Sequence, residues 1–169
     1  MQYLILHAGM PKTGSTAFQY LLGKYADELS KFSIHIANSP NREPYIRQYT
    51  EISEYLLRIN LDTHLRQWSP QVILPSVRNE FYLDIKSNLS SNCEKVIMSS
   101  EDLFFIRKEE ELQKLADLTE RTIHVIITLR SPEGFLRSYK NQIYKNNMLP
   151  SLYKDSVNYL NSDSWLIDY

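Results

Sequence analysis

Three short apolar runs, separated by helical patterns, constrain the fold of this chain more than any other feature. They cover residues 3–7, 96–99 and 123–129 and are rich in Ile, Val and Leu. Runs of this length and composition are typical of strands buried in a parallel sheet. A short Ile-His-Ile segment at residues 34–36 is a candidate fourth strand. The alternation of strands and helices predicts an α/β fold, a three-layer sandwich around a central parallel sheet.

The segments between the runs carry helical periodicity. The first helix is expected at residues 15–24, with an apolar face made of Ala17, Phe18, Leu21 and Leu22. The acidic run at residues 109–111 predicts the start of a second helix, since acids are favoured at helix N-termini. Residues 131–133 (Ser-Pro-Glu) predict a third, with a capping serine followed by proline.

The middle and the end of the chain are less regular. Two Tyr- and Leu-rich helical stretches, near residues 43–60 and 77–89, flank a loop that contains Trp68. No repeat or linker divides the chain, so residues 1–169 are interpreted as one domain. The last six residues, 164–169, read as the start of another helix without a cap. We therefore expect that the domain lacks its C-terminal portion.

Composition excludes several functional classes. The chain carries 19 Lys and Arg against 20 Asp and Glu, a net charge of −1, so it lacks the basic surplus of a nucleic-acid binder. It has one cysteine and no apolar run long enough to span a membrane. Its four histidines show no metal-ligand spacing, so we expect no metal site. These features predict a cytoplasmic protein without a membrane span.

The loop after the first run carries the strongest functional motif. Gly9 and Gly14, two of only four glycines, frame it, and Lys12 lies between them. Three hydroxyl side chains accompany them: Thr13, Ser15 and Thr16. A strand-to-helix loop presents backbone N–H groups and the positive end of a helix dipole, which favour a phosphate or sulfate group. The loop is not a Walker A motif, because no lysine follows Gly14. The alternative is a simple glycine-containing turn with an exposed lysine.

The stretch Gly-Met-Pro-Lys-Thr-Gly-Ser-Thr at residues 9–16 resembles the 5′-phosphosulfate loop of sulfotransferases. These enzymes use 3′-phosphoadenosine 5′-phosphosulfate (PAPS) as the sulfuryl donor. The resemblance implies that Lys12 neutralises charge on the leaving phosphate. It also implies a second motif, in which an arginine at a strand end and a serine eight positions later bind the 3′-phosphate.

The chain contains that second motif. Arg130 follows the third apolar run, and Ser138 lies eight positions further, inside the helix expected after Pro132. The planar guanidinium group matches phosphate oxygens well. Taken alone, the pair would read as an arginine capping a strand end and a serine on a helix surface. The two motifs occur in the expected order, and each lies at a strand-to-helix junction.

A sulfotransferase also needs a general base for the acceptor hydroxyl. Our candidate is Glu101, which follows the run at residues 96–99 and should face the same sheet edge as Lys12 and Arg130. The alternative is that Glu101 is a first-turn acid of a capped helix. The other candidates for the base are Glu43, His35 and His7.

The resemblance therefore predicts a bacterial-type, cytoplasmic, PAPS-dependent sulfotransferase that acts on a hydroxyl of a glycan or small molecule. The alternatives are a P-loop kinase for a small metabolite and a nucleotide-binding module without catalysis. The order and spacing of Arg130 and Ser138 count against the kinase.

Overall fold

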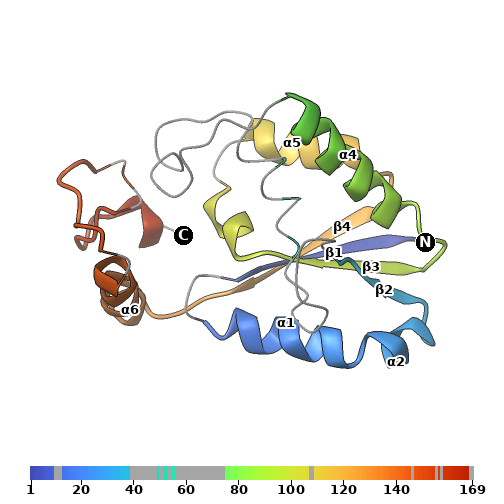
Figure 1. Cartoon of the computed structure of the whole chain (residues 1–169), viewed down its shortest axis with the longest axis horizontal. Helices are drawn as coiled ribbons and strands as arrows, with labels where there is room; N and C mark the ends of the chain where they lie inside the picture. Colours follow the sequence, from blue (N-terminus) through green and yellow to red (C-terminus); the bar gives the residue numbers. More distant parts are fainter. Residues whose placement is uncertain are drawn as a thin grey trace.

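The structure is a computed structural model, and it describes residues 1–9, 13–38, 49, 52, 55, 75–106, 109–145, 147–154, 156 and 158–167. Its centre is a sheet of four parallel strands in the order β2-β3-β1-β4 (Figure 1). Their bounds are β1 (Tyr3–Gly9), β2 (Ile34–Ile36), β3 (Lys95–Ser99) and β4 (Thr122–Thr128). The predicted α/β fold with a parallel sheet is confirmed, including the short fourth strand.

Helices flank the sheet (Figure 1). On one side lie α1 (Ser15–Lys24) and α2 (Ala26–Ser30), and on the other lie α4 (Pro75–Leu89) and α5 (Glu109–Leu118). Helix α6 (Pro132–Lys145) follows β4, and short 3-10 helices occur at η3 (Glu101–Phe105) and η4 (Trp165–Ile167). The helix expected to start at residue 164 is therefore a single 3-10 turn. Most of the stretch expected at residues 43–60 lies outside the described residues.

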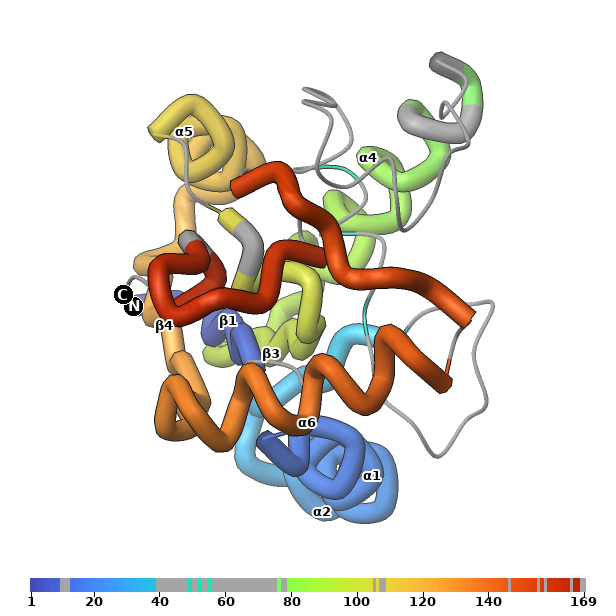
Figure 2. The backbone as a smooth tube through the Cα atoms, turned by 90° about the vertical axis from the view of Figure 1, so that its left-hand side faces the viewer, coloured from blue at the N-terminus to red at the C-terminus, as the bar shows by residue number. Residues whose placement is uncertain are grey.

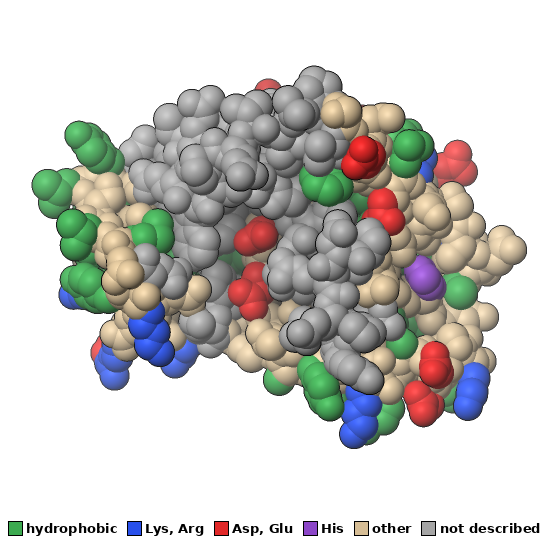
Figure 3. Space-filling model, in the orientation of Figure 1, with side chains coloured by type: hydrophobic (Ala, Val, Ile, Leu, Met, Phe, Trp, Pro, Cys, Tyr) green, Lys and Arg blue, Asp and Glu red, His purple; other side chains and the backbone are tan. Residues whose placement is uncertain are grey.

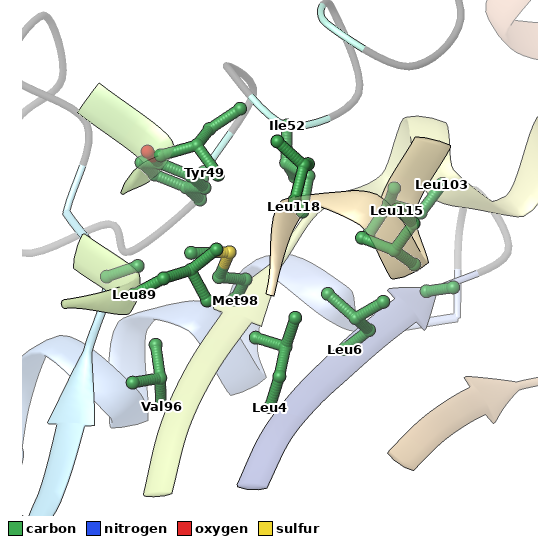
Figure 4. Packing of buried hydrophobic residues seen from close by; sticks show 13 residues of the cluster. Leu4, Leu6, Tyr49, Ile52, Leu89, Val96, Met98, Leu103, Leu115 and Leu118 are labelled. Carbon is green, nitrogen blue, oxygen red and sulfur yellow. The ribbon is translucent and has the colours of Figure 1, made fainter. Parts of the chain in front are cut away.

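The main core lies between the sheet and the helices on its α4 and α5 side. Leu4 and Leu6 of β1 and Met98 of β3 point toward Leu115 and Leu118 of α5 (Figure 4). None of these five side chains is more than 2% exposed. Burial of each such side chain stabilises the fold by about 1.5–3 kcal/mol. The alternation of Leu4 and Leu6 along β1 therefore sets which face of that strand meets this layer.

Strand β4 differs from the buried strand that its apolar sequence predicts. It lies at the edge of the sheet and pairs with β1. Val125, Ile126 and Ile127 are 53%, 49% and 54% exposed, and Leu129 just beyond the strand is 53% exposed. A continuous apolar run indicates a strand but not its place in the sheet, because the strand order depends on how the helices cross over.

The buried face of α1 also differs from the prediction. Ser15, Gln19 and Leu22 are the buried residues of this helix, whereas Phe18 and Leu21 are 38% and 48% exposed. Two polar side chains thus take positions against the sheet that the apolar pattern had assigned to Phe18 and Leu21. A buried polar residue needs hydrogen-bond partners, so Ser15 and Gln19 indicate a polar cluster beneath the N-terminus of α1.

Helix α6 lies beyond the carboxyl ends of the strands. Figure 2 looks toward those ends and shows α6 crossing in front of them, between α1 and the last segment of the chain. A second apolar cluster, which includes Phe104, Phe135, Tyr139 and Leu166, packs α6 against η3 and η4. Within the described part of the chain, no helix is both long and apolar enough to cross a membrane.

Candidate functional site

The predicted site residues follow the carboxyl ends of three neighbouring strands. The 9–14 loop follows β1, Glu101 follows β3, and Arg130 follows β4. Because β1 lies between β3 and β4, its loop lies between the other two segments. The register pairs His7 with Ser99 and Gly9 with Thr128 across these strands. This edge is where open α/β sheets bind ligands.

The described part of the first loop ends at the N-terminus of α1, where backbone N–H groups lack helical acceptors. Gly14 is the N-cap of α1, with a φ of 87° and no side-chain cap hydrogen bond. The Ala17 and Phe18 N–H groups donate to the Gly14 carbonyl at 3.0 and 3.2 Å. The Ser15 and Thr16 N–H groups precede these first helical bonds, so they point out of the helix end. Lys12 lies outside the described residues.

Gly9 allows β1 to pass close to α1 and β4. A Cβ atom at this position would lie 2.9 Å from Ser15 Cβ and 3.2 Å from Thr128 Oγ1. A contact of 2.9 Å between carbon atoms is well inside van der Waals distance, so the loop can follow this path only because residue 9 is glycine.

The structure brings Glu101 to the start of α1. The Ser15 hydroxyl donates a hydrogen bond to the Glu101 Oε1 atom. Ser15 is 3% exposed, whereas Glu101 is half-buried. Glu101 is the first residue of η3, and the Ser100 N–H before it donates to the His7 carbonyl at 3.0 Å, which holds this segment beside the end of β1. Glu101 therefore contacts a residue of the predicted anion loop directly.

Arg130 lies two residues before the start of α6 at Pro132, and Ser138 lies within that helix, eight residues further along the chain. A Cβ atom at Gly134 would lie 3.2 Å from Arg130 Nε and 2.8 Å from Ser131 Oγ. Gly134 and Ser138 are four residues apart and so share a face of the helix. The Gly134 N–H donates to Ser131 Oγ at 3.3 Å, which agrees with the predicted serine cap. The sequence analysis did not select Gly134. The available signal was a glycine inside an expected helix, where glycine is unfavourable.

Charge at this end of the molecule is mainly positive. Figure 3 shows Lys and Arg side chains gathered at the α6 end. Arg130, Arg137, Lys140 and Lys145 are exposed, and Glu133 pairs with Arg137 at 2.6 Å. An excess of cations near the second motif raises the local potential for a polyanionic ligand.

A buried polar cluster lies directly beneath the loop. His7, 2% exposed, has Nδ1 at 2.8 Å from Ser99 Oγ and Nε2 at 3.4 Å from Thr128 Oγ1. Gln19 Nε2 donates to Ser99 Oγ at 3.1 Å, and Thr128 Oγ1 lies 3.1 Å from Thr13 Oγ1. Burial lowers the pKa of His7 below its ordinary value, so the ring is neutral at neutral pH.

The sequence analysis missed Gln19, Ser99 and Thr128. Thr128 is the polar last residue of an apolar strand, and Gln19 interrupts an apolar helix face, so both were visible as exceptions to a pattern. Ser99 was visible only as part of the strand. Nothing in the sequence showed that they meet around His7.

Of the other candidates for the base, His7 lies in the buried cluster beneath the loop, whereas His35 lies at the far edge of the sheet. His35 Nε2 lies 3.0 Å from Asn88 Oδ1, on the strand at the opposite edge of the sheet from β4. His124 lies on β4 with its ring centroid 5.2 Å from that of Tyr3. Glu43 and His64 are outside the described residues. Among the residues placed by the structure, no three His, Cys, Asp or Glu side chains are grouped to hold a metal ion.

Comparison with known proteins matched no family model, no curated protein and no solved structure.

Proposed function

We propose that this protein is a PAPS-dependent sulfotransferase that moves a sulfuryl group to an acceptor hydroxyl, on a glycan or a small molecule. The observation that carries the proposal is the hydrogen bond from Ser15 to Glu101. It places a carboxylate at the first turn of the helix that follows the anion loop. A sulfuryl group held there would have a general base beside it.

The position of the two motifs supports a ligand with anionic groups at both ends. The loop at Gly14 and the Arg130 segment follow adjacent strands, β1 and β4. In PAPS the 5′-phosphosulfate would lie against Lys12, Thr13, Gly14, Ser15 and Thr16. The 3′-phosphate would lie against Arg130 and Ser138, on the helix whose exposed side is mainly basic. In this proposal the strand, loop and helix at residues 3–24 form the P-loop-like unit of a three-layer sulfotransferase fold.

The proposed reaction is an in-line displacement at sulfur. The acceptor hydroxyl oxygen attacks the sulfur atom while Glu101 takes the hydroxyl proton. The bond between sulfur and the bridging phosphate oxygen breaks, and 3′-phosphoadenosine 5′-phosphate (PAP) leaves with that electron pair. Lys12 and the N-terminus of α1 stabilise the negative charge on the leaving oxygen. Most of the catalysis comes from positioning and charge stabilisation, as in phosphoryl transfer.

Calorimetry with PAP and with Mg-ATP tests the ligand. We expect PAP to bind in the absence of magnesium and more tightly than Mg-ATP, because Arg130 and Ser138 would contact the 3′-phosphate that ATP lacks. Magnesium-dependent ATP binding with indifference to PAP would favour a small-metabolite kinase and overturn the proposal. Binding of PAP without any transfer to a panel of glycosides would favour a nucleotide-binding module.

The variant Glu101→Gln tests the base. We expect transfer from PAPS to fall by roughly 10²–10⁴-fold, the usual contribution of a general base, with PAP affinity unchanged. The matched control is Glu109→Gln, which makes the same chemical change at an exposed acid on α5. Transfer by the Glu101 variant at the rate of this control would assign the base to another residue.

A further inference from the structure

Strand β4 exposes an apolar part of the sheet. It pairs with β1 on one side, and among the described residues no strand pairs with its other side. Ile123 packs against the main core cluster, and Val125 and Ile127 lie on the same face of the strand, because side chains alternate along it. Val125 is next to Leu6 of β1, which is 2% exposed, yet Val125 and Ile127 are 53% and 54% exposed. The apolar face of the sheet therefore continues across β4 without the cover that it has over β1.

The composition of β4 favours pairing on both sides. A free edge presents backbone N–H and C=O groups to other chains, and proteins commonly block such an edge with a charged residue or a proline. The seven residues of β4, Thr-Ile-His-Val-Ile-Ile-Thr, contain no Lys, Arg, Asp, Glu, Pro or Gly. All except the histidine are β-branched, the type that packs well between paired strands. Nothing in the sequence of β4 therefore opposes a further strand.

The sequence of β4 is nearly a palindrome about its middle residue, Val125. Thr122 and Thr128 occupy the two ends, and Ile123 and Ile127 lie next to them. When two copies pair antiparallel about a two-fold axis at the middle residue, Thr faces Thr, Ile faces Ile and Val faces Val, and only His and Ile form an unlike pair. Pairs of β-branched side chains and Thr–Thr pairs stabilise neighbouring strands. A two-fold interface requires such self-complementarity, because the same surface supplies both halves.

Charge beyond the ends of β4 favours the same arrangement. Glu120 lies two residues before the strand, and Arg130 lies two residues after it. In the antiparallel pair, Glu120 of one copy lies at the end of the interface where Arg130 of the other copy lies, so charges of opposite sign attract. A parallel pair in the same register would instead bring like charges together. This attraction depends on the sign of the charges and requires no direct contact between the two side chains.

We propose that β4 is an interaction surface for a second copy of this chain, which pairs with it antiparallel about Val125 to form one continuous eight-stranded sheet. Val125 and Ile127 of both copies then form a single apolar strip across the centre of that sheet. The carboxyl ends of the strands point in opposite directions in the two copies, so the two candidate sites lie at opposite edges of the shared sheet. The pairing does not depend on which ligand those sites bind.

Light scattering on the purified chain measures the assembly. We expect twice the mass of one chain for the wild type and the mass of one chain for Val125→Lys, because two lysines would face each other across the two-fold axis. Circular dichroism checks that this variant is folded. The matched control is Leu152→Lys, at a side chain outside the sheet that is 94% exposed, and it should keep the double mass. A wild-type mass of one chain at every concentration would mean that another strand, not a second copy, covers β4, and an equal loss in both variants would also overturn the proposal.

Disulfide trapping tests the register with a smaller change. In a Cys93→Ser background, which removes the single cysteine, Val125→Cys places two thiols opposite each other. Facing residues of antiparallel strands have Cα atoms about 4.5–5.5 Å apart, which suits a disulfide, so oxidation should link the two chains. The matched control is Thr122→Cys, whose two copies would lie about 20 Å apart along the strands and should not link. Linkage of the Thr122 variant, or its absence in the Val125 variant, would contradict the antiparallel pairing about Val125.

Discussion

Replacing Arg121 should destabilise the fold more than replacing any exposed charged residue would. Arg121 is 6% exposed and joins α5 to β4. Its guanidinium donates to the carbonyls of Leu89, Ser91 and Cys93 at 3.0, 2.6 and 3.0 Å. Leu89 is the last residue of α4, where helix carbonyls lack helical partners and a cation is favoured. One side chain therefore binds the end of α4 and two carbonyls of the connection between α4 and β3.

The size of the effect follows from these contacts. Three hydrogen bonds at about 1 kcal/mol each give a loss of about 3 kcal/mol in unfolding free energy. A fourth contact, from Nη1 to the Glu94 carbonyl, adds little because its 3.4 Å is long for an N–H···O hydrogen bond. For a chain of this length, about 3 kcal/mol lowers Tm by roughly 6–12 °C.

Urea unfolding of Arg121→Met, which keeps the aliphatic stem, measures the loss. The matched control is Arg137→Met on α6, where the arginine side chain is 74% exposed and pairs with Glu133. An exposed pair of this kind contributes about 0.5 kcal/mol or less. An Arg121→Met variant within about 1 kcal/mol of the control would refute the reasoning, since it would mean that water replaces the guanidinium at these carbonyls.

Two further predictions concern the site. The pKa of His7 is lowered in the folded protein from its ordinary value of 6.5. As the pH falls below about 6.5, the imidazole of His7 is therefore protonated in the unfolded chain before it is protonated in the folded protein, so the free energy of unfolding should decrease. The free energy of unfolding of His7→Phe should depend less on pH across this range. An unchanged slope would contradict the assignment. Gly9→Ala should destabilise the protein by about 1–3 kcal/mol, because its Cβ would meet the Ser15 side chain. Gly14→Ala has open space but a φ of 87°, so it should cost only about 1 kcal/mol, and thermal unfolding of the two variants checks this order.

The elements of this fold were largely predictable because their patterns are local. The apolar runs and the 131–133 capping sequence each depend on a few neighbouring residues, and the corresponding strands and helix occur within one or two residues of the prediction. Burial was less predictable. Val125 and Ile127 look like core residues in the sequence, yet they lie on an edge strand and are about half exposed.

In the candidate site, too, the residue types were predictable from the sequence and the contacts between distant residues were not. The two anion motifs and Glu101 could be selected from the sequence, because each follows a strand and carries the residue types that bind or activate such groups. The hydrogen bond between Ser15 and Glu101 joins residues 86 positions apart, and the approach of Thr128 to His7 joins residues 121 apart. No local sequence pattern indicates which distant residues form such pairs.

The sequence by itself determined the alternation of strands and helices, the glycines that let the first loop turn, and the chemistry available at the ends of the strands. Only the tertiary structure decided the strand order, and with it the rest of the site. Because β1 lies between β3 and β4, Ser99 and Thr128 reach His7 from opposite sides. Strand order depends on the packing of whole helices against the sheet, so it is a property of the assembled chain and not of any one segment.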